Sequence, residues 1–320
     1  MLTPQFLQLF EIDSAALAQE AAAGLSAHPA ALSPKFFYDA LGSRLFDAIT
    51  ELPEYYPTRT EAAIFEVHGS KMAQRVKYAL PNDFALVDLG AGNCAKAARL
   101  FDALAPAHYV AVDISVDFVR DAVHCLQGRY PTIKMTAVGM DFSTQLALPP
   151  GLIEGPALVF YPGSSIGNFD PEQALGLLRQ AQALSAGGAL LIGVDLVKDT
   201  AVLELAYDDP LGVTAAFNLN LLRHLNRLLG TNFDVRDWRH VGLFNPGASR
   251  IEMHVEARRA ITVSWPGGER RFASGERIHS ENSYKWRRLE FEALLQQAGF
   301  RQVRAWTDER QWFSVMLASH

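Results

Sequence analysis

Residues 84–95 read "FALVDLGAGNCA", an apolar run that ends in a turn containing Gly90 and Gly92. The segment 94–105 then carries apolar side chains at helical spacing. Glycines between a strand and a helix let the backbone turn tightly and approach a ligand closely. The Gly-x-Gly-x-x-Ala pattern, which ends at Ala95, is typical of a site for a nucleotide-type ligand, and a purely structural glycine turn is the alternative.

Four more short apolar runs follow, at residues 108–115, 133–143, 157–163 and 188–196. Helical segments lie between most of them, and this alternation indicates a parallel sheet covered on both faces. The chain then continues with a helix over 287–300 and two strands, 301–308 and 310–319. Their connection is too short for a parallel return, so these two strands must be antiparallel. The predicted fold is a doubly wound, Rossmann-like α/β sheet with an antiparallel C-terminal hairpin.

Two parts of the chain do not follow this alternation. Residues 1–59 are helical in pattern, and the sequence Thr-Arg-Thr-Glu at 58–61 has the form of a capping box, which predicts that the next helix opens there. The insertion 197–286 is first helical and then alternates like antiparallel strands. We therefore expect a ligand-binding core of residues 60–196 and 287–320, and a second α+β lobe formed by residues 1–59 and 197–286.

The overall composition excludes several classes of protein. The 320 residues carry a net charge of −6 and lack the basic stripe that nucleic-acid binding needs. No apolar run is long enough to span a bilayer, and the first residues lack the features of a signal peptide. Cys94 and Cys125, the only cysteines, predict no disulfide framework, and the histidines lack metal-ligand spacing. We expect a cytoplasmic monomer that acts on a small molecule, without a metal site and without nucleic-acid or membrane partners.

Three aspartates at predicted strand ends bear on the identity of the nucleotide. Asp113 ends the second strand, where a carboxylate can accept hydrogen bonds from both ribose hydroxyls. Asp88, in the last turn of the first strand, would repel a pyrophosphate but attract an amino group. Asp141 ends the third strand, where its carboxylate could bond an adenine amino group. With the antiparallel hairpin, these acids favour S-adenosylmethionine over a nicotinamide dinucleotide, and capping of the following loops is the alternative interpretation of Asp88 and Asp141.

Four longer motifs extend this interpretation to the whole chain: "FFYDALGSRLFDAITELPEYYPTRTEA" (36–62), "YPGSSIGNFDP" (161–171), "AYDDPLGVTAAFNLNLL" (206–222) and "HSENSYKW" (279–286). The chain resembles, on these motifs, the histidine-specific Nα-methyltransferases of ergothioneine biosynthesis. The resemblance implies a class I methyltransferase fold and S-adenosylmethionine as methyl donor. It also implies trimethylation of the α-amino group of L-histidine to the betaine hercynine, the first step of ergothioneine biosynthesis.

The resemblance also implies site residues. Together with the glycine turn and the acids above, it gives a set of donor-binding residues: Asp88, Gly90, Gly92, Lys96, Asp113, Asp141 and Phe142. The set that would line the amino-acid site is Tyr38, Tyr55, Gly163, Asn168, Tyr207, Met253, Glu281 and Ser283. Tyr38 and Asn168 would be the catalytic pair, because they would orient the lone pair of the neutral amine while water takes its proton.

The chemistry of several of these side chains fits such roles, and each has a simpler alternative. The amide of Asn168 can hold an amine and a carboxylate at once, although it could instead support the turn before the next helix. Glu281 would accept the N–H of an imidazole while Ser283 bonds the other ring nitrogen, although a solvated loop glutamate is the simpler interpretation. Tyr38 and Tyr55 lie in aromatic clusters, which by default pack in a core or a lid.

Three other functions remain open from the sequence. The first is a methyltransferase of the same fold that acts on another amino acid, such as tyrosine or tryptophan, and the presence of Glu281, Ser283 and Met253 argues against it. The second is a nicotinamide-dependent oxidoreductase, which the acids at the strand ends disfavour. The third is a non-catalytic nucleotide-binding module, which the dense set of polar substrate residues disfavours.

Overall fold

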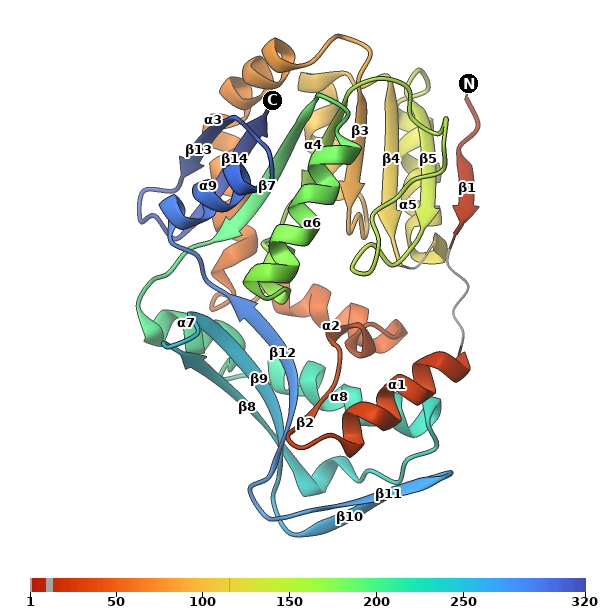
Figure 1. Cartoon of the computed structure of the whole chain (residues 1–320), viewed down its shortest axis with the longest axis vertical. Coiled ribbons are helices and arrows are strands. Elements are labelled where there is room, and N and C mark those ends of the chain that lie inside the picture. Colours follow the sequence, from red (N-terminus) through yellow and green to blue (C-terminus); the bar gives the residue numbers. More distant parts are fainter. Residues whose placement is uncertain (1, 10–13, 115) are drawn as a thin grey trace. The chain divides into compact units, whose positions relative to one another are not determined.

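The structure, a computed structural model, describes residues 2–9, 14–114 and 116–320. The chain divides into two compact units. Unit 1 takes in residues 1–11, 59–196 and 286–320, and unit 2 takes in residues 12–58 and 197–285. Residues 1–11 were expected to belong to the second lobe, with the rest of 1–59. Within them, residues 5–8 form a strand of the unit 1 sheet (Figure 1).

An eight-stranded sheet forms the centre of unit 1 (Figure 1). Its strand order is β1 (Gln5–Gln8), β5 (Lys134–Gly139), β4 (His108–Asp113), β3 (Ala85–Leu89), β6 (Ala157–Tyr161), β7 (Ala189–Asp195), β14 (Phe313–Ser319) and β13 (Gln302–Thr307). The first six strands of this order are parallel to one another. β14 runs antiparallel to both β7 and β13, so the predicted parallel sheet with an antiparallel C-terminal hairpin is confirmed.

The predicted strands are present, with some differences at their ends. β4 ends at Asp113, and Ser115, the last residue of its predicted range, lies outside the described residues. β5 ends at Gly139, so Asp141 lies in the following loop and does not end the strand as predicted. β1 was not predicted, because four partly exposed edge residues are too few to show a strand pattern.

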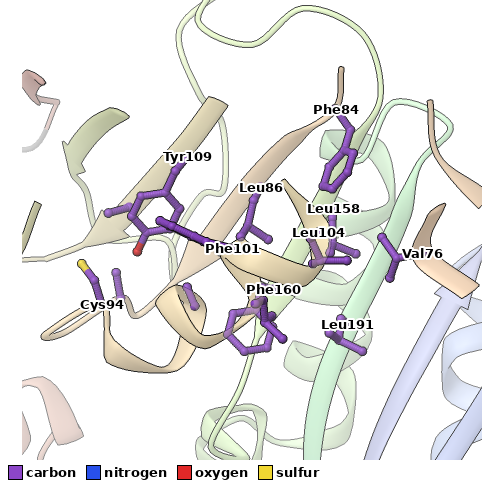
Figure 2. Close-up of a cluster of buried hydrophobic side chains, with 14 of the residues drawn as sticks. Val76, Phe84, Leu86, Cys94, Phe101, Leu104, Tyr109, Leu158, Phe160 and Leu191 are labelled. Atoms are coloured by element: carbon purple, nitrogen blue, oxygen red, sulfur yellow. The ribbon is translucent and has the colours of Figure 1, made fainter. Parts of the chain in front are cut away.

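Helices cover both faces of the unit 1 sheet. One face packs against α3 (Tyr56–Ala79), α4 (Ala95–Leu104) and α5 (Val116–Arg129). Figure 2 shows part of this core: Val76, Phe101 and Leu104 from the helices, and Leu86, Tyr109, Leu158, Phe160 and Leu191 from the strands. The other face packs against α6 (Pro171–Leu184), which in turn contacts α9 (Arg288–Gln297). Because side chains are buried on both faces, the central strands read as continuous apolar runs.

The predicted capping box at residues 58–61 is wrong. α3 begins at Tyr56, so Glu61 lies in the second turn of the helix and not in its cap. The Glu61 side chain is buried and bonds to other elements of unit 1, as described below. Glu61 therefore lies within the helix, and its carboxylate points into the buried interior of unit 1.

Unit 2 combines helices with two small sheets. Its helices are α1 (Ser14–Ser26), α2 (Ala40–Thr50), α7 (Thr200–Tyr207) and α8 (Val213–Leu228), with 3₁₀ turns at Pro34–Phe37 and Val235–Asp237. One sheet has the order β2 (Ala30–Ala31), β12 (Arg277–Tyr284), β9 (Arg250–Ala257) and β8 (Trp238–Asn245), and the other pairs β10 (Ile261–Trp265) with β11 (Gly268–Phe272). The insertion is thus helical and then antiparallel, as its sequence pattern predicts.

Asp39 joins the helices of unit 2. Its carboxylate caps α2 by accepting from Gly42 N at 2.7 Å, and it also accepts from Asn220 Nδ2 of α8 at 2.8 Å. Arg227, about two helical turns further along α8, forms an ion pair with the same carboxylate. The rings of Phe37 and Phe217 stack with centroids 4.6 Å apart. α8 is therefore held against the segment 34–50 by both polar and aromatic contacts.

Candidate active site

The glycine turn after β3 is built as its sequence predicts. Gly90 and Gly92 have φ of 69° and 53°, in the left-handed region that favours glycine. Gly92 N donates to Asp113 Oδ2 at 2.9 Å, so the carboxylate at the end of β4 holds the turn. A Cβ added at Gly90 would find only Phe142 Cζ, at 4.0 Å, and one added at Gly92 only Gly90 O, at the same distance. Among the residues that the structure describes, the space over both glycines is therefore open.

Asp88 is buried beneath this turn, with 2% of its surface exposed. Tyr109 Oη donates to Asp88 Oδ2 at 2.8 Å. Burial raises the pKa of Asp88 from 3.8 to about 7, against the opposing effects of the Tyr109 hydrogen bond and the positive charge of Lys96. The carboxyl group is therefore part of the polar lining beneath the loop, and its contact with the donor stays a prediction.

Asp141 and Phe142 lie in the loop after β5. Asp141 Oδ1 accepts from Ser143 N at 3.0 Å and from Ser143 Oγ, so the alternative role of capping its own loop is realised. Phe142 meets Tyr161, at the end of β6, edge to face with ring centroids 5.8 Å apart. The loop therefore presents an aromatic ring close to the space over Gly90.

A buried carboxylate that the sequence analysis missed connects two of the predicted site residues. Glu61 of α3 is 2% exposed and accepts from Lys96 Nζ of α4 at 2.7 Å. Its other oxygen accepts from Gly163 N, after β6, also at 2.7 Å. Gly163 has φ of 79°, and a Cβ there would lie 3.0 Å from Lys96 Nζ. Gly193 of β7 makes room for the carboxylate, because a Cβ at that position would clash with Glu61 Oε1.

Asn168 closes the loop that follows Gly163. Ser164 has φ of 59°, and its Oγ accepts from Asp195 N at 2.8 Å, which fixes the start of the loop to β7. A 3₁₀ turn over Ser165–Asn168 follows. Asp170 then caps α6 with a complete capping box. The loop is thus tied down on both sides of Asn168.

The other predicted amino-acid residues lie in unit 2, where aromatic rings form a continuous series. Tyr38 meets Phe46 at 5.9 Å between centroids, Phe46 meets Tyr55 at 6.2 Å, and Tyr55 meets Tyr207 at 6.2 Å, each edge to face. Tyr38 also contacts Phe217 at 5.8 Å and is 41% exposed. The aromatic packing that was the alternative interpretation is therefore present, and the phenol groups of the three tyrosines sit within it.

Tyr207 joins this series to a polar cluster at the end of β12. Tyr207 Oη and Ser283 Oγ are 2.8 Å apart, and Lys285 Nζ donates to them at 3.0 Å and 2.8 Å. The ammonium group also lies 4.7 Å from the centroid of the Tyr207 ring. Lys285 was not singled out in the sequence, although it lies within the motif that contains Glu281 and Ser283.

Met253 and Glu281 are paired across β9 and β12. The register shifts between His279 and Glu281, which marks a bulge at this point of β12. Met253 is buried at 2% exposure, and the structure thus brings Met253, Glu281, Ser283 and Tyr207 into one region of unit 2. Gly163 and Asn168, by contrast, belong to unit 1.

The residues around the glycine turn fit S-adenosylmethionine. Open space lies over Gly90 and Gly92, and an acid at the end of β4 holds the turn. Lys96, which is bonded to Glu61, adds a cation, and its side chain keeps 41% of its surface exposed. A donor with a carboxylate, a ribose and an adenine but no phosphate suits this set of charges.

A metal site and a membrane-crossing helix are both absent from the described residues. Among residues 2–9, 14–114 and 116–320, no group of three or more His, Cys, Asp or Glu side chains could hold a metal ion. None of the helices in the part of the chain that the structure describes is long and apolar enough to cross a membrane.

Comparison with known proteins gives matches over nearly the whole chain. The chain is 42% identical over 315 residues to the histidine N-alpha-methyltransferase of Mycolicibacterium smegmatis, with 96% of each protein covered. It is 39% identical over 312 residues to the protein of the same name from Mycobacterium tuberculosis, with 95% of each covered. It is 31% identical over 299 residues to Ergothioneine biosynthesis protein 1 of Neurospora crassa, covering 91% of this chain and 33% of that protein.

A solved structure, the CcbJ methyltransferase from Streptomyces caelestis, aligns with a TM-score of 0.49 and 16% identity, over 88% of this chain and 99% of that chain. The family model of histidine-specific, S-adenosylmethionine-dependent methyltransferases matches residues 17–320. The match takes in both units, and the chain belongs to this family of histidine-specific, S-adenosylmethionine-dependent methyltransferases.

Proposed function

We propose that this chain transfers methyl groups from S-adenosylmethionine to the α-amino nitrogen of L-histidine, and that three transfers give hercynine, the first step of ergothioneine biosynthesis. The observation that carries this proposal is the match, over 96% of both proteins, to a histidine N-alpha-methyltransferase. The similarity to an ergothioneine biosynthesis protein supports the pathway. Family membership also removes the nicotinamide-dependent oxidoreductase and the non-catalytic binding module from consideration.

Seven residues of unit 1 would hold the donor: Asp88, Gly90, Gly92, Lys96, Asp113, Asp141 and Phe142. When bound, S-adenosylmethionine supplies an electrophilic methyl group on a sulfonium centre. Asp113 would accept hydrogen bonds from the ribose hydroxyls, and Lys96 would face the donor carboxylate. Asp141 would bond the adenine amino group and Phe142 would contact the adenine ring. The open space over the glycines supports this arrangement.

The ring of histidine would be recognised by Glu281 and Ser283. Glu281 accepts the imidazole N–H and Ser283 bonds the other ring nitrogen, while Met253 supplies apolar contact. Tyr55 and Tyr207 line the site with their ring edges and hydroxyl groups. An amino acid that lacks these ring nitrogens would leave polar groups of the protein unpaired, and this is expected to give selectivity for histidine.

The α-amino group would be oriented by Tyr38, Asn168 and the backbone at Gly163. A nearby positive sulfonium lowers the pKa of the substrate ammonium, because like charges disfavour the charged form. Tyr38 and Asn168 would then direct the lone pair of the neutral amine, and water would take the proton. The amine would displace the methyl group from the sulfonium without forming a covalent bond to the protein. Positioning of the two reactants would therefore supply most of the rate enhancement.

We further propose that the enzyme works as a cytoplasmic monomer, with small molecules as its only ligands. The absence of a basic stripe in the sequence disfavours a nucleic-acid partner.

Mass spectrometry tests the proposal directly. The purified protein is incubated with S-adenosylmethionine and each of histidine, tyrosine and tryptophan. We expect three successive methyl additions to histidine alone. Methylation of another amino acid in preference to histidine, or no transfer at all, would refute it.

Two variants test the catalytic assignment. Tyr38→Phe and Asn168→Ala should each lower the rate of histidine methylation, since each loses a polar group that orients the amine. Asn168→Ala should weaken histidine binding far more than donor binding. Wild-type turnover in both variants would remove these residues from the mechanism.

A further inference from the structure

A buried ammonium group lies next to the hydroxyl of Ser283. Lys285 directly follows β12 and is only 2% exposed. Its backbone is fixed on both sides by Ser249, because Lys285 N donates to Ser249 O at 2.8 Å and Ser249 Oγ donates to Lys285 O at 2.7 Å. Burial of a lysine is costly unless its N–H groups are bonded, so this side chain is expected to have a specific role.

The bonding capacity of Lys285 dictates the direction of its hydrogen bonds. An ammonium has three donors and no acceptor. Ser283 Oγ and Tyr207 Oη, which lie 2.8 Å and 3.0 Å from Nζ, must therefore both accept from it. The cation cannot receive the hydrogen of either hydroxyl.

The bond between the two hydroxyls also has a preferred direction. Tyr207 Oη and Ser283 Oγ are 2.8 Å apart, and by geometry alone either could donate. A phenol is far more acidic than an aliphatic alcohol and is the better donor. Tyr207 is therefore the favoured donor, and in that arrangement Ser283 accepts from both Lys285 and Tyr207. Two accepted bonds occupy both lone pairs of the serine oxygen.

Tyr207 is itself held in place from β8. His240 Nε2 lies 2.8 Å from Tyr207 O, and Asn218 Nδ2 lies 2.7 Å from His240 Nδ1. The amide NH₂ of Asn218 can only donate, so His240 Nδ1 must accept. His240 Nε2 must then carry the hydrogen that goes to Tyr207 O. Burial lowers the pKa of His240, which favours this neutral form. The residue that donates to Ser283 thus has a fixed backbone.

We propose that Lys285 is a positioning residue that makes Ser283 an obligatory hydrogen-bond donor to the substrate ring. With its lone pairs occupied, Ser283 can offer a ligand only its O–H. The ring must then present an acceptor, which is the unprotonated nitrogen of a neutral imidazole, while Glu281 takes the ring N–H. The inference rests on histidine being the substrate. The inference adds a physical reason why a ring that offers a hydrogen-bond donor but no acceptor would bind poorly.

A pair of ligands isolates this contact. L-Histidine has both a ring N–H and a ring acceptor, whereas 3-(pyrrol-3-yl)-L-alanine keeps an N–H but has no acceptor nitrogen. Dissociation constants for both are measured by calorimetry with S-adenosylhomocysteine, the demethylated donor, present. In the wild-type protein the pyrrole analogue should bind about 10- to 100-fold more weakly, because it leaves the Ser283 donor unpaired.

Removing the ammonium should abolish most of that preference. In Lys285→Met, Ser283 regains an unoccupied lone pair and its hydroxyl can turn away, so the ratio of the two dissociation constants should fall below about fivefold. Lys285→Arg, which keeps a cationic donor, should retain more of the ratio than Lys285→Met. Lys77→Met, which removes an exposed lysine of α3, is the matched control and should leave the ratio unchanged.

A second variant keeps the test valid if Lys285→Met fails to fold. Ser283→Ala removes the donor itself and should also reduce the ratio below about fivefold. A wild-type ratio in either Lys285→Met or Ser283→Ala overturns the inference. Methylation of histidine by the wild-type protein is measured first. Its failure refutes the proposed function together with this inference, whereas normal methylation with an unchanged ratio refutes the inference alone.

Discussion

Replacement of Glu61 by glutamine removes the negative charge that bonds to both Lys96 and Gly163, with almost no change in the shape of the side chain. The carboxylate accepts from Gly163 N and from Lys96 Nζ, both at 2.7 Å, and is 2% exposed. In Glu61→Gln the amide oxygen can still accept from Gly163 N. The amide NH₂, however, then faces the ammonium of Lys96, where two donors oppose each other. The variant therefore loses the ion pair but keeps the side-chain volume, so no cavity forms.

The size of the effect follows from the exposure of the two partners. Hydrogen bonds to charged groups contribute roughly 1.5–3 kcal/mol. The Lys96 side chain keeps 41% of its surface in solvent, which screens the pair and brings the expected loss toward the lower part of that range. We expect the free energy of unfolding to fall by about 1–2 kcal/mol in Glu61→Gln. Glu61→Ala also leaves Gly163 N–H without its acceptor and should cost about 3 kcal/mol.

Urea denaturation followed by circular dichroism measures these losses. Glu66→Gln, on the exposed side of the same helix, is the matched control and should change stability by less than about 0.5 kcal/mol. Because Lys96 and Gly163 are proposed to contact the ligands, Glu61→Gln should also raise the dissociation constant of S-adenosylmethionine by about 3- to 10-fold, corresponding to roughly 1 kcal/mol. Stability equal to the wild type in Glu61→Gln would show that the carboxylate is not needed as a charge.

Substitutions at three other positions test particular features of unit 1. The pKa of Asp88 rises from 3.8 to about 7 on folding, so the folded state holds its proton more tightly and stability falls as the pH increases between these values. Asp88→Asn should remove this fall, worth at most roughly 4 kcal/mol, and urea denaturation at pH 5 and pH 8 should show a smaller difference than in the wild type. Gly163→Ala places a side chain at a φ of 79° and should destabilise the fold by about 1–2 kcal/mol; an unchanged urea midpoint would contradict the strain. Asp170→Ala removes the cap of α6 and should cost about 1 kcal/mol, whereas Asp170→Asn should recover most of it, both read from thermal melting.

Much of unit 1 could be predicted because its strands are buried on both faces. A strand such as β3 or β6 shows five buried residues in a row, which gives a continuous apolar run in the sequence. The antiparallel hairpin of β13 and β14 followed from the length of one connection. The glycine turn was recognisable because its backbone needs φ values that other residues rarely adopt.

Local signals were least informative where an element is short or has competing patterns. β1 has only four residues, and it is defined by pairing with β5, more than a hundred residues further along the chain. At residues 58–61 a capping pattern was present, but α3 starts at Tyr56. Tertiary contacts of Glu61 account for the glutamate at that position, and a local motif had the same residue types by coincidence.

The charged residues that organise the site are those that the sequence could least identify. A lone Glu or Lys is normally a solvated surface residue, so neither Glu61 nor Lys285 stands out by type. Their partners lie far away in the chain: Glu61 bonds to a residue 102 positions later, and Lys285 to one 78 positions earlier. What distinguishes them is burial together with partners of defined donor and acceptor character, and both properties arise only when distant segments pack. A buried charge sets the direction of the hydrogen bonds that it makes, as Lys285 does for Ser283. We therefore expect substitutions at Glu61 and Lys285 to change ligand preference more than substitutions of exposed residues of the same type, such as Glu66 and Lys77.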